Sequence, residues 1–482
     1  MRHSIFSVLG FTAVISSVAL GADSATTPRP VPLTRPVMKE LLEDMKQRKP
    51  RIPLPELTAE EKEKLGERGG GYESRLRSLY MPPGTGGFGG GGTRPAGNPA
   101  DSTKTGKNAP GQTREQDPKN TLDNAFKVEL FWIVSRANNC QYCLGHQESK
   151  LLAAGLKEEQ IAALDCDWSR FSPKEQTAFA FARKFTHEPH LLADSDIESL
   201  RKHFTEMQIL EMILSMAGNN SINRWKEGTG VPQSQGGGNF GSRGTTPPAA
   251  ETTPMTHSYL TATPEEFQDK VTLVAPLQID EKTGKPTTLA VCNRPNLESP
   301  EKVEQKLAAC QKRTPRLPLV AEAEARQVLG EAWPEKAPLP QWVRLLANFP
   351  RDGKSRVSGM VASEEKGDLT PVLKAQVSWI IARQDGAWYA AGLAKKRLLE
   401  LGQTEEQIYK LDGSWEGFTP ADQSLFTVAR KLAASPVVLT DEDVENALKL
   451  TGPRDVVQLI SYTTNRASFD RITEAAGLQL DK

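Results

Sequence analysis

The sequence carries no excess of charge of either sign. Its 60 lysine and arginine residues balance 60 aspartate and glutamate residues, which gives a formal net charge of zero. A neutral chain supplies no electrostatic reason to bind nucleic acid or an anionic membrane, and the sequence has no basic run of the usual kind. We therefore expect no nucleic-acid partner.

Long apolar runs are also missing beyond the N-terminus. No later segment approaches the ~20 apolar residues that a membrane-spanning helix needs, so we expect no membrane span. Residues 1–22 differ, because Arg2 precedes an apolar run that ends at Leu20. This pattern is typical of a secretory signal peptide cleaved near Gly21 or Ala22, and the alternative is a membrane anchor. We expect a soluble exported protein, periplasmic or extracellular, in a compartment where disulfides persist.

Alternating strand patterns are nearly absent. Residues 271–279 and 287–291 are the one region where the pattern allows strands. Helix signals are frequent instead. Ser172 and Glu175 form a capping box with Pro173 at the first helical position, and an apolar stripe follows. The sequence therefore predicts an all-α protein.

The chain contains an internal repeat. Residues 132–230 align with residues 379–477 at a constant shift of 247 without a gap, so that WIVSR meets WIIAR. Residues 82–120 and 232–254 are rich in glycine or proline and poor in apolar residues, which predicts flexible linkers. We expect two tandem helical bundles with these parts: an N-terminal extension at 23–81, a first unit at 121–231, an insertion at 255–312 and a second unit at 313–482.

Two cysteines and a histidine follow one another at three-residue steps, Cys140, Cys143 and His146. Haem attachment needs a histidine directly after the second cysteine, where this chain has Leu144. A closed zinc site needs a fourth ligand, and no second CxxC pair accompanies the first. The candidates for a fourth ligand are Cys166, His187 and His190. A static disulfide across three residues stabilises little, so a redox-active dithiol without metal or cofactor is favoured.

Helix signals surround the cysteines. Two asparagines, at 138 and 139, can end one apolar helix, and a new helix can begin at Cys140. A thiol in the first turn of a helix is expected to have a lowered pKa, because unpaired N–H groups stabilise the thiolate. Glu129 lies eleven residues earlier among apolar neighbours. From the residues alone it is either the polar edge of a helix, which is favoured, or a partly buried general base.

The combination of Glu129, the CxxC pair, His146 and the tail NNSINRW at 219–225 resembles the alkylhydroperoxidase D branch of the carboxymuconolactone decarboxylase superfamily. The resemblance implies that Cys143 attacks a peroxide, that Cys140 resolves the oxidised sulfur, and that Glu129 and His146 relay protons. It also implies an unidentified thiol electron donor and a homo-oligomer. This chain departs from the family in one spacing, since the family's histidine lies four residues after the second cysteine.

The second unit lacks every one of these groups. The aligned pairs are Cys140 with Ala387, Cys143 with Ala390, His146 with Leu393 and Glu129 with Gln376. Since much of the surrounding frame is retained, the four residues are expected to act as one set in the first unit, with the second unit as a packing partner. The function expected is that of a secreted thiol peroxidase. The alternatives are a non-enzymatic scaffold or binding protein and a thiol–disulfide exchanger.

Three cysteines lie outside the CxxC pair. Cys292 and Cys310 both fall in the insertion, which has too few apolar residues for a strong core of its own. A bridge between them would close a loop of about 18 residues and contribute roughly 3 kcal/mol. We therefore expect a Cys292–Cys310 disulfide, with Cys166 as a buried free thiol.

Overall fold

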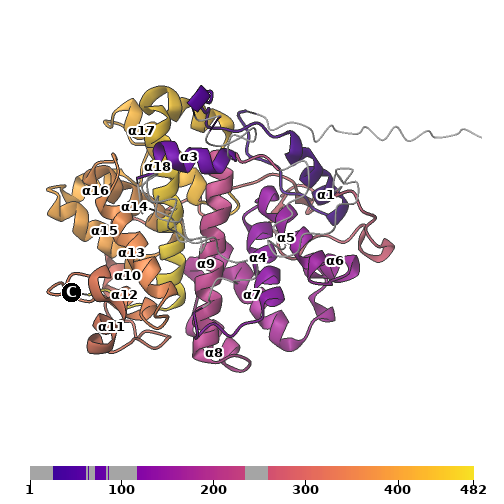
Figure 1. Cartoon of the computed structure of the whole chain (residues 1–482), viewed down its shortest axis with the longest axis horizontal. Coiled ribbons are helices and arrows are strands. Elements are labelled where there is room, and N and C mark those ends of the chain that lie inside the picture. Colours follow the sequence, from indigo (N-terminus) through magenta and orange to yellow (C-terminus); the bar gives the residue numbers. More distant parts are fainter. Residues whose placement is uncertain are drawn as a thin grey trace, which may run out of the picture.

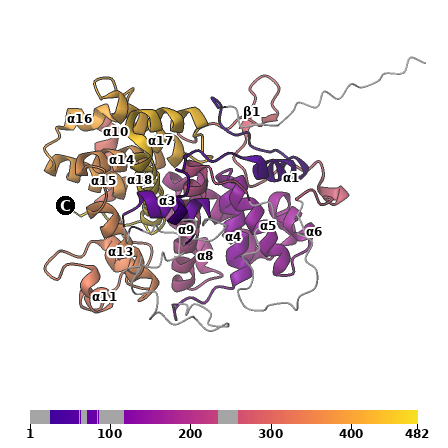
Figure 2. The same cartoon turned by 45° about the horizontal axis from the view of Figure 1, so that its top comes forward.

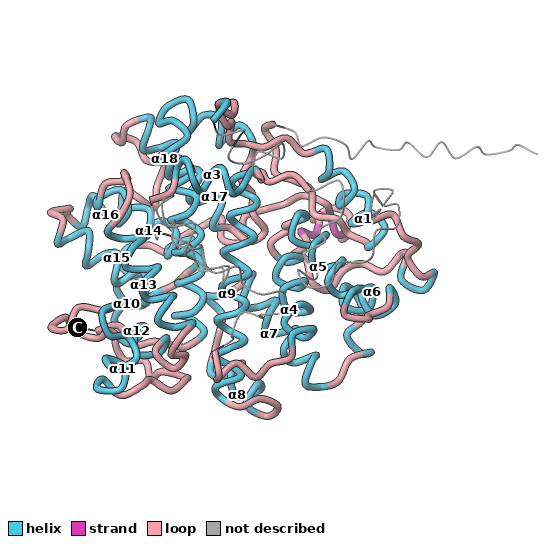
Figure 3. Tube along the Cα trace, viewed as in Figure 1, coloured by secondary structure: helices cyan, strands magenta, loops and turns pink. Residues whose placement is uncertain are grey.

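A computed structural model describes residues 25–60, 63, 71–82, 85, 117–233 and 259–481. Helices dominate these residues (Figure 3), so the all-α prediction is confirmed. The two-residue strands β1 (Gln278–Ile279) and β2 (Pro286–Thr287) pair antiparallel within the region where strands were expected. The expected signal peptide lies outside the described residues, as do most of the two expected linkers.

The helices of the N-terminal half are α1 (Arg35–Asp44), α3 (Tyr72–Tyr80), α4 (Asn124–Ala137), α5 (Gln141–Ala153), α6 (Glu158–Cys166), α7 (Pro173–His187), α8 (Asp194–Arg201) and α9 (Glu206–Thr229). Those of the C-terminal half are α10 (Pro300–Cys310), α11 (Glu322–Leu329), α12 (Gln341–Leu346), α13 (Asp352–Glu365), α14 (Pro371–Asp385), α15 (Trp388–Glu400), α16 (Glu405–Lys410), α17 (Pro420–Ala433) and α18 (Asp441–Ala475). Short 3₁₀ turns cover Met45–Gln47, Trp168–Arg170, Pro189–Leu191, Glu265–Phe267 and Gly330–Ala332.

Local side-chain caps explain where several helices begin. Asp123 accepts hydrogen bonds from the N–H groups of Ala125 and Phe126 at the start of α4. Ser172 and Glu175 form the predicted capping box of α7. Each cap supplies partners for N–H groups that a helix N-terminus leaves open, so these ends are set by nearby sequence.

The two longest helices form the centre of the molecule. Figure 1 shows α9 and α18 side by side, with α4 to α7 on one flank and α10 to α16 on the other, and Figure 2 shows the same arrangement after a 45° turn. α18 contains a break at Gly452, whose φ is +84°, directly before Pro453. Glycine adopts this conformation without a Cβ clash, and proline cannot continue the helical hydrogen bonding.

Equivalent contacts recur in the two units. The Gln233 N–H donates to the Met45 carbonyl at 3.1 Å, and the Leu480 N–H donates to the Cys310 carbonyl at 3.2 Å. Helix α1 packs on α5, and helix α10 packs on α15. Helix α10 lies in the segment expected to belong to neither unit, yet its Val303 side chain is part of the main hydrophobic core.

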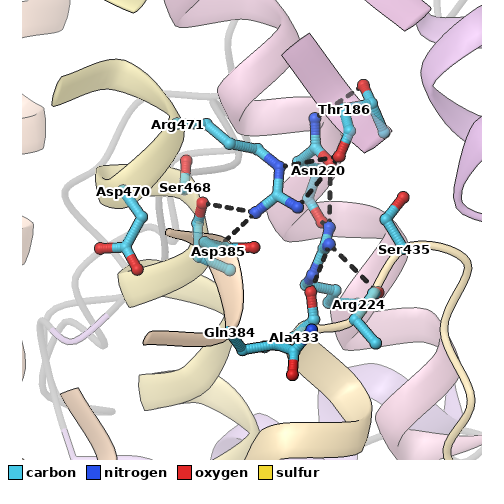
Figure 4. Close-up of polar contacts among 12 residues, drawn as sticks. Thr186, Asn220, Arg224, Gln384, Asp385, Ala433, Ser435, Ser468, Asp470 and Arg471 are labelled. Carbon is cyan, nitrogen blue, oxygen red and sulfur yellow. Dashed lines mark hydrogen bonds and ion pairs between the residues drawn. The ribbon is translucent and has the colours of Figure 1, made fainter. Parts of the chain in front are cut away.

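Two aligned arginines join the units through reciprocal contacts (Figure 4). Arg224 on α9 donates to the carbonyl of Ala433 at 2.9 Å, near the end of α17. Arg471 on α18 donates to the carbonyl of Thr186 at 3.1 Å, near the end of α7. Arg471 also forms a fully buried ion pair with Asp385 at 2.8 Å. Arg224, which belongs to the tail motif, therefore holds the two units together.

Candidate active site around the cysteine pair

The backbone places the two cysteines at the start of α5. Asn139 has a φ of +58°, a left-handed conformation that asparagine tolerates better than most residues. Cys140 is the N-cap residue of α5, with φ −88° and ψ 90°, and Cys143 is the third residue of the helix. The break at the two asparagines is as predicted, while Cys140 lies one residue before the helix rather than in its first turn.

Both thiols are buried and free. Cys140 is 0% exposed and Cys143 is 2% exposed. Burial, followed by the hydrogen bond and charge of Cys143 and the charge of Glu227, raises the pKa of Cys140 well above its usual value. The sequence-based prediction of a lowered pKa is therefore wrong for Cys140, because loss of solvent outweighs the helix N-terminus.

Glu227 is a site residue that the sequence reasoning missed. The negative charge of its carboxylate contributes to the raised pKa of Cys140, and the carboxylate lies 3.3 Å from Arg29 and 3.5 Å from Arg48. Burial acts to raise the pKa of Glu227, but these cations more than offset it, so the pKa is lowered. The carboxylate is therefore charged and close to the thiol.

The internal repeat could have revealed Glu227, because the aligned position of the second unit is also a glutamate. This counterpart is Glu474, which pairs with Arg313 at 3.0 Å in the second unit. The carboxylate and its arginine partner thus occur in both units, whereas the thiol occurs only in the first. The carboxylate belongs to the shared frame, and Cys140 is placed against it.

His146 is a neutral imidazole one turn beyond Cys143. It is buried, and its ring centroid lies 4.5 Å from that of Tyr142. Burial, reinforced by the positive charges of Lys226 and Lys150, lowers the pKa of His146 to about 4. His146 is therefore neutral at physiological pH and can accept a proton, but its burial also makes it a weaker base than an exposed histidine.

Glu129 is buried in α4 rather than placed on an exposed edge, with 8% of its surface accessible. Burial, with smaller effects of the negative charges of Glu175 and Asp123, raises its pKa to about 7. Such a carboxyl can exchange protons near neutral pH. Among the described residues, the electrostatic partners of Glu129 do not include Cys140 or His146. The environment of Glu129 thus suits a general base, but Glu129 does not contact the thiols directly.

The residues considered for a zinc site do not come together. No group of three or more His, Cys, Asp or Glu side chains in the described ranges could hold a metal ion. The Cys166 thiol is half-buried and donates to the Ala162 carbonyl at 3.3 Å, and His187 contacts the Ser435 carbonyl at 2.9 Å. Within the same ranges, no helix is long and apolar enough to cross a membrane.

The predicted Cys292–Cys310 disulfide is wrong, because both thiols are free and contact different elements. Cys292 accepts a hydrogen bond from Gln384 at the end of α14, at 3.2 Å. Cys310 is buried at the end of α10 and lies 3.6 Å from the Leu478 carbonyl. The insertion was expected to need a crosslink for lack of its own core. Instead, helix α10 of the insertion packs into the main hydrophobic core, and this packing stabilises the insertion without a disulfide.

The second unit keeps the local backbone without the thiols. Ala387, at the position of Cys140, caps α15 with φ −90° and ψ 91°. Its N–H donates to the carbonyl five residues earlier, as the Cys140 N–H does. Gly386, with φ +62°, occupies the position of Asn139. The turn therefore forms equally with alanine, so the thiols are not needed to shape it.

In comparisons with known proteins, no family model matches this chain and no curated sequence matches it.

Proposed function

We propose that the first unit is an exported thiol-dependent peroxidase of the alkylhydroperoxidase D type. One observation carries the proposal: the backbone of Cys140 and that of Ala387 are the same to within a few degrees. The thiol of Cys140 is thus not needed to shape this turn. The two cysteines are retained in one unit beside a charged carboxylate and a neutral histidine, which is an arrangement suited to thiol chemistry.

The environment of each thiol supports a division of roles. Burial, the hydrogen bond and charge of Cys143 and the negative charge of Glu227 raise the pKa of Cys140 and keep it a protonated thiol. A protonated thiol is a poor nucleophile toward a peroxide, so we assign the first attack to Cys143 and leave to Cys140 the later reaction with the sulfenic acid. Cys143 lies inside the helix, on the same side as the neutral His146, and therefore suits the attacking role.

The proposed chemistry begins at Cys143. Its proton passes to His146, and the thiolate attacks one peroxide oxygen. The O–O bond breaks, and the departing alkoxide takes the proton from His146 and leaves as an alcohol, or as water from hydrogen peroxide. Cys143 has then lost two electrons and carries the new S–O bond of a sulfenic acid.

Cys140 completes the cycle. Its sulfur attacks the sulfenic sulfur of Cys143, an S–S bond forms, and the S–O bond breaks. The released hydroxide takes the Cys140 proton and leaves as water. An external dithiol, which we propose as the electron donor, returns both cysteines to thiols by exchange.

The surroundings of α5 favour small peroxides. A Cβ atom on Gly145 would lie 2.3 Å from Nε2 of Gln233 and 2.8 Å from the hydroxyl of Tyr259. These two side chains hydrogen-bond each other at 2.8 Å and lie against the first turns of the helix. Together with the burial of Cys143, this close cover leaves little room for a bulky substrate.

A peroxidase assay with dithiothreitol as donor tests the proposal. The wild-type protein should consume hydrogen peroxide, and Cys143→Ser should not. Cys166→Ser is the matched control, because this thiol lies in the same unit outside the site, and it should keep full turnover. Absence of turnover in the wild type with every small peroxide would instead favour a scaffold, and activity on a scrambled disulfide protein alone would favour a thiol–disulfide exchanger.

A further inference from the structure

The second unit contains a cavity of about 550 Å³, bounded by α13, α14, α15 and α18. This volume is within the range of small-molecule sites, roughly 300–1,000 Å³. An aromatic wall forms one side, where Trp342 makes edge-to-face contacts with Trp333 and Phe469, each at 5.6 Å between ring centroids. Leu393, at the position of His146, also lines the cavity. The lining is therefore mainly apolar and suited to an apolar ligand.

A small polar cluster interrupts this apolar lining. The Tyr462 hydroxyl donates to Glu364 at 2.8 Å and contacts the Ser378 hydroxyl at 2.8 Å. Arg466 stacks on the Phe469 ring with its guanidinium carbon 4.4 Å from the centroid, and one of its N–H groups lies 3.5 Å from the same Glu364 oxygen. A cation and a hydroxyl donor therefore meet within the cavity.

The guanidinium is incompletely satisfied. The Arg466 side chain is only 9% exposed. Its ion-pair partner Glu364 lies at the long distance of 3.5 Å and has a side chain that is 46% exposed. The buried Nε of Arg466 has no hydrogen-bond partner among the described residues. A buried guanidinium is most stable when a carboxylate accepts two of its N–H groups. Because Glu364 reaches solvent, it can turn away and leave this place to another carboxylate.

The polar cluster is particular to the second unit. The residues at the aligned positions of the first unit are Ser215 for Tyr462, Asn219 for Arg466 and Ile222 for Phe469. A unit that only packed against its neighbour would not require a buried cation beside an aromatic wall. The second unit thus lacks the thiols but has groups of its own that can recognise a ligand.

We propose that the second unit binds a small apolar carboxylate, such as an arylalkanoate. Its apolar body lies against Trp342 and Phe469, and its carboxylate accepts hydrogen bonds from Arg466 and Tyr462 in place of Glu364. The proposal is independent of the peroxidase chemistry, since none of these residues belongs to the first unit.

Isothermal titration of the full chain with 3-phenylpropanoate tests the proposal, and the neutral 3-phenylpropanamide is the comparison ligand. The carboxylate should bind one per chain, and about 10- to 100-fold more tightly than the amide, the range expected for a hydrogen bond to a charged group. No binding of the carboxylate at millimolar concentration, or equal binding of both ligands, would overturn the proposal.

Two leucines of α15 provide a matched pair of variants. Leu393→Trp fills the cavity and should abolish binding, whereas Leu399→Trp adds the same group at a position that is 43% exposed and should leave binding intact. Circular dichroism checks that both variants fold. Unchanged binding in folded Leu393→Trp would place the ligand elsewhere and refute the site.

Glu364→Gln keeps the proposal testable if the tryptophan variant does not fold. Because this half-exposed carboxylate competes for the guanidinium, its removal should tighten carboxylate binding severalfold and leave amide binding unchanged. Arg466→Gln should remove the preference for the carboxylate. If neither variant changes that preference, the guanidinium does not recognise the ligand and the proposal fails.

Discussion

Replacing Glu129 with Gln should stabilise the protein at alkaline pH and have no effect at acidic pH. Burial, with Glu175 and Asp123, raises the pKa of Glu129 from 4.5 to about 7. This shift corresponds to about 3 kcal/mol, because one pKa unit is worth ~1.4 kcal/mol. Between these two pKa values the folded chain holds a proton that the unfolded chain releases. The contribution of Glu129 to the free energy of unfolding therefore falls as the pH rises from about 4.5 to about 7.

Urea unfolding followed by tryptophan fluorescence, repeated across this pH range, measures the effect. The stability advantage of Glu129→Gln over the wild type should grow from none at acidic pH to about 3 kcal/mol at pH ~8, because the two proteins share every other titrating group. Glutamine fits the position, because the second unit buries Gln376 at the aligned place. Glu159→Gln is the control, since this glutamate is exposed on α6 and its replacement should leave the pH profile unchanged.

The same variant, Glu129→Gln, distinguishes the effect of Glu129 on stability from its role in proton transfer. Parallel stability profiles for the wild type and Glu129→Gln would refute the burial argument. If Glu129 also belongs to the proton relay, the variant should lose peroxidase turnover by ~10²–10⁴-fold, the usual cost of removing a general base. Full turnover together with increased stability would show that the buried carboxyl is costly to the fold and has no part in the chemistry.

Three further predictions follow from the cysteines and the unit–unit contact. In Cys140→Ser, a sulfenic-acid probe added with peroxide should label Cys143, and a lack of label would contradict the proposed roles. Arg471→Met should destabilise the chain by roughly 3–5 kcal/mol in urea unfolding, because it leaves Asp385 buried and unpaired; the double variant with Asp385→Asn should recover much of this loss. Peptide mapping without reduction should recover Cys310 as a free thiol, and a linked Cys310 peptide would restore the disulfide hypothesis.

Features that depend on neighbouring residues could be predicted from the sequence. The all-α class, the capping box of Ser172 and Glu175, and the break before Cys140 all depend on contacts within a few residues. The constant shift of 247 also aligned Cys140 with Ala387, and the structure gives these two residues the same backbone.

Features that depend on distant segments could not be predicted in this way. The pKa of Cys140 is raised, because segments far away in the chain exclude solvent and bring Glu227 to the thiol. Helix α10 packs into the main core instead of relying on a crosslink at Cys310. Burial decides both outcomes, and spacing in the sequence does not reveal what covers a residue.

The sequence by itself thus determined the helical class, the repeat and the positions of the cysteines, since each is encoded by local pattern. The tertiary structure alone decided which groups surround them. It placed Glu227 against Cys140, paired Arg471 with Asp385 between the units, and left a cavity around Arg466. The physical reason is that desolvation and electrostatic interaction act through space, and only the packed chain sets those distances.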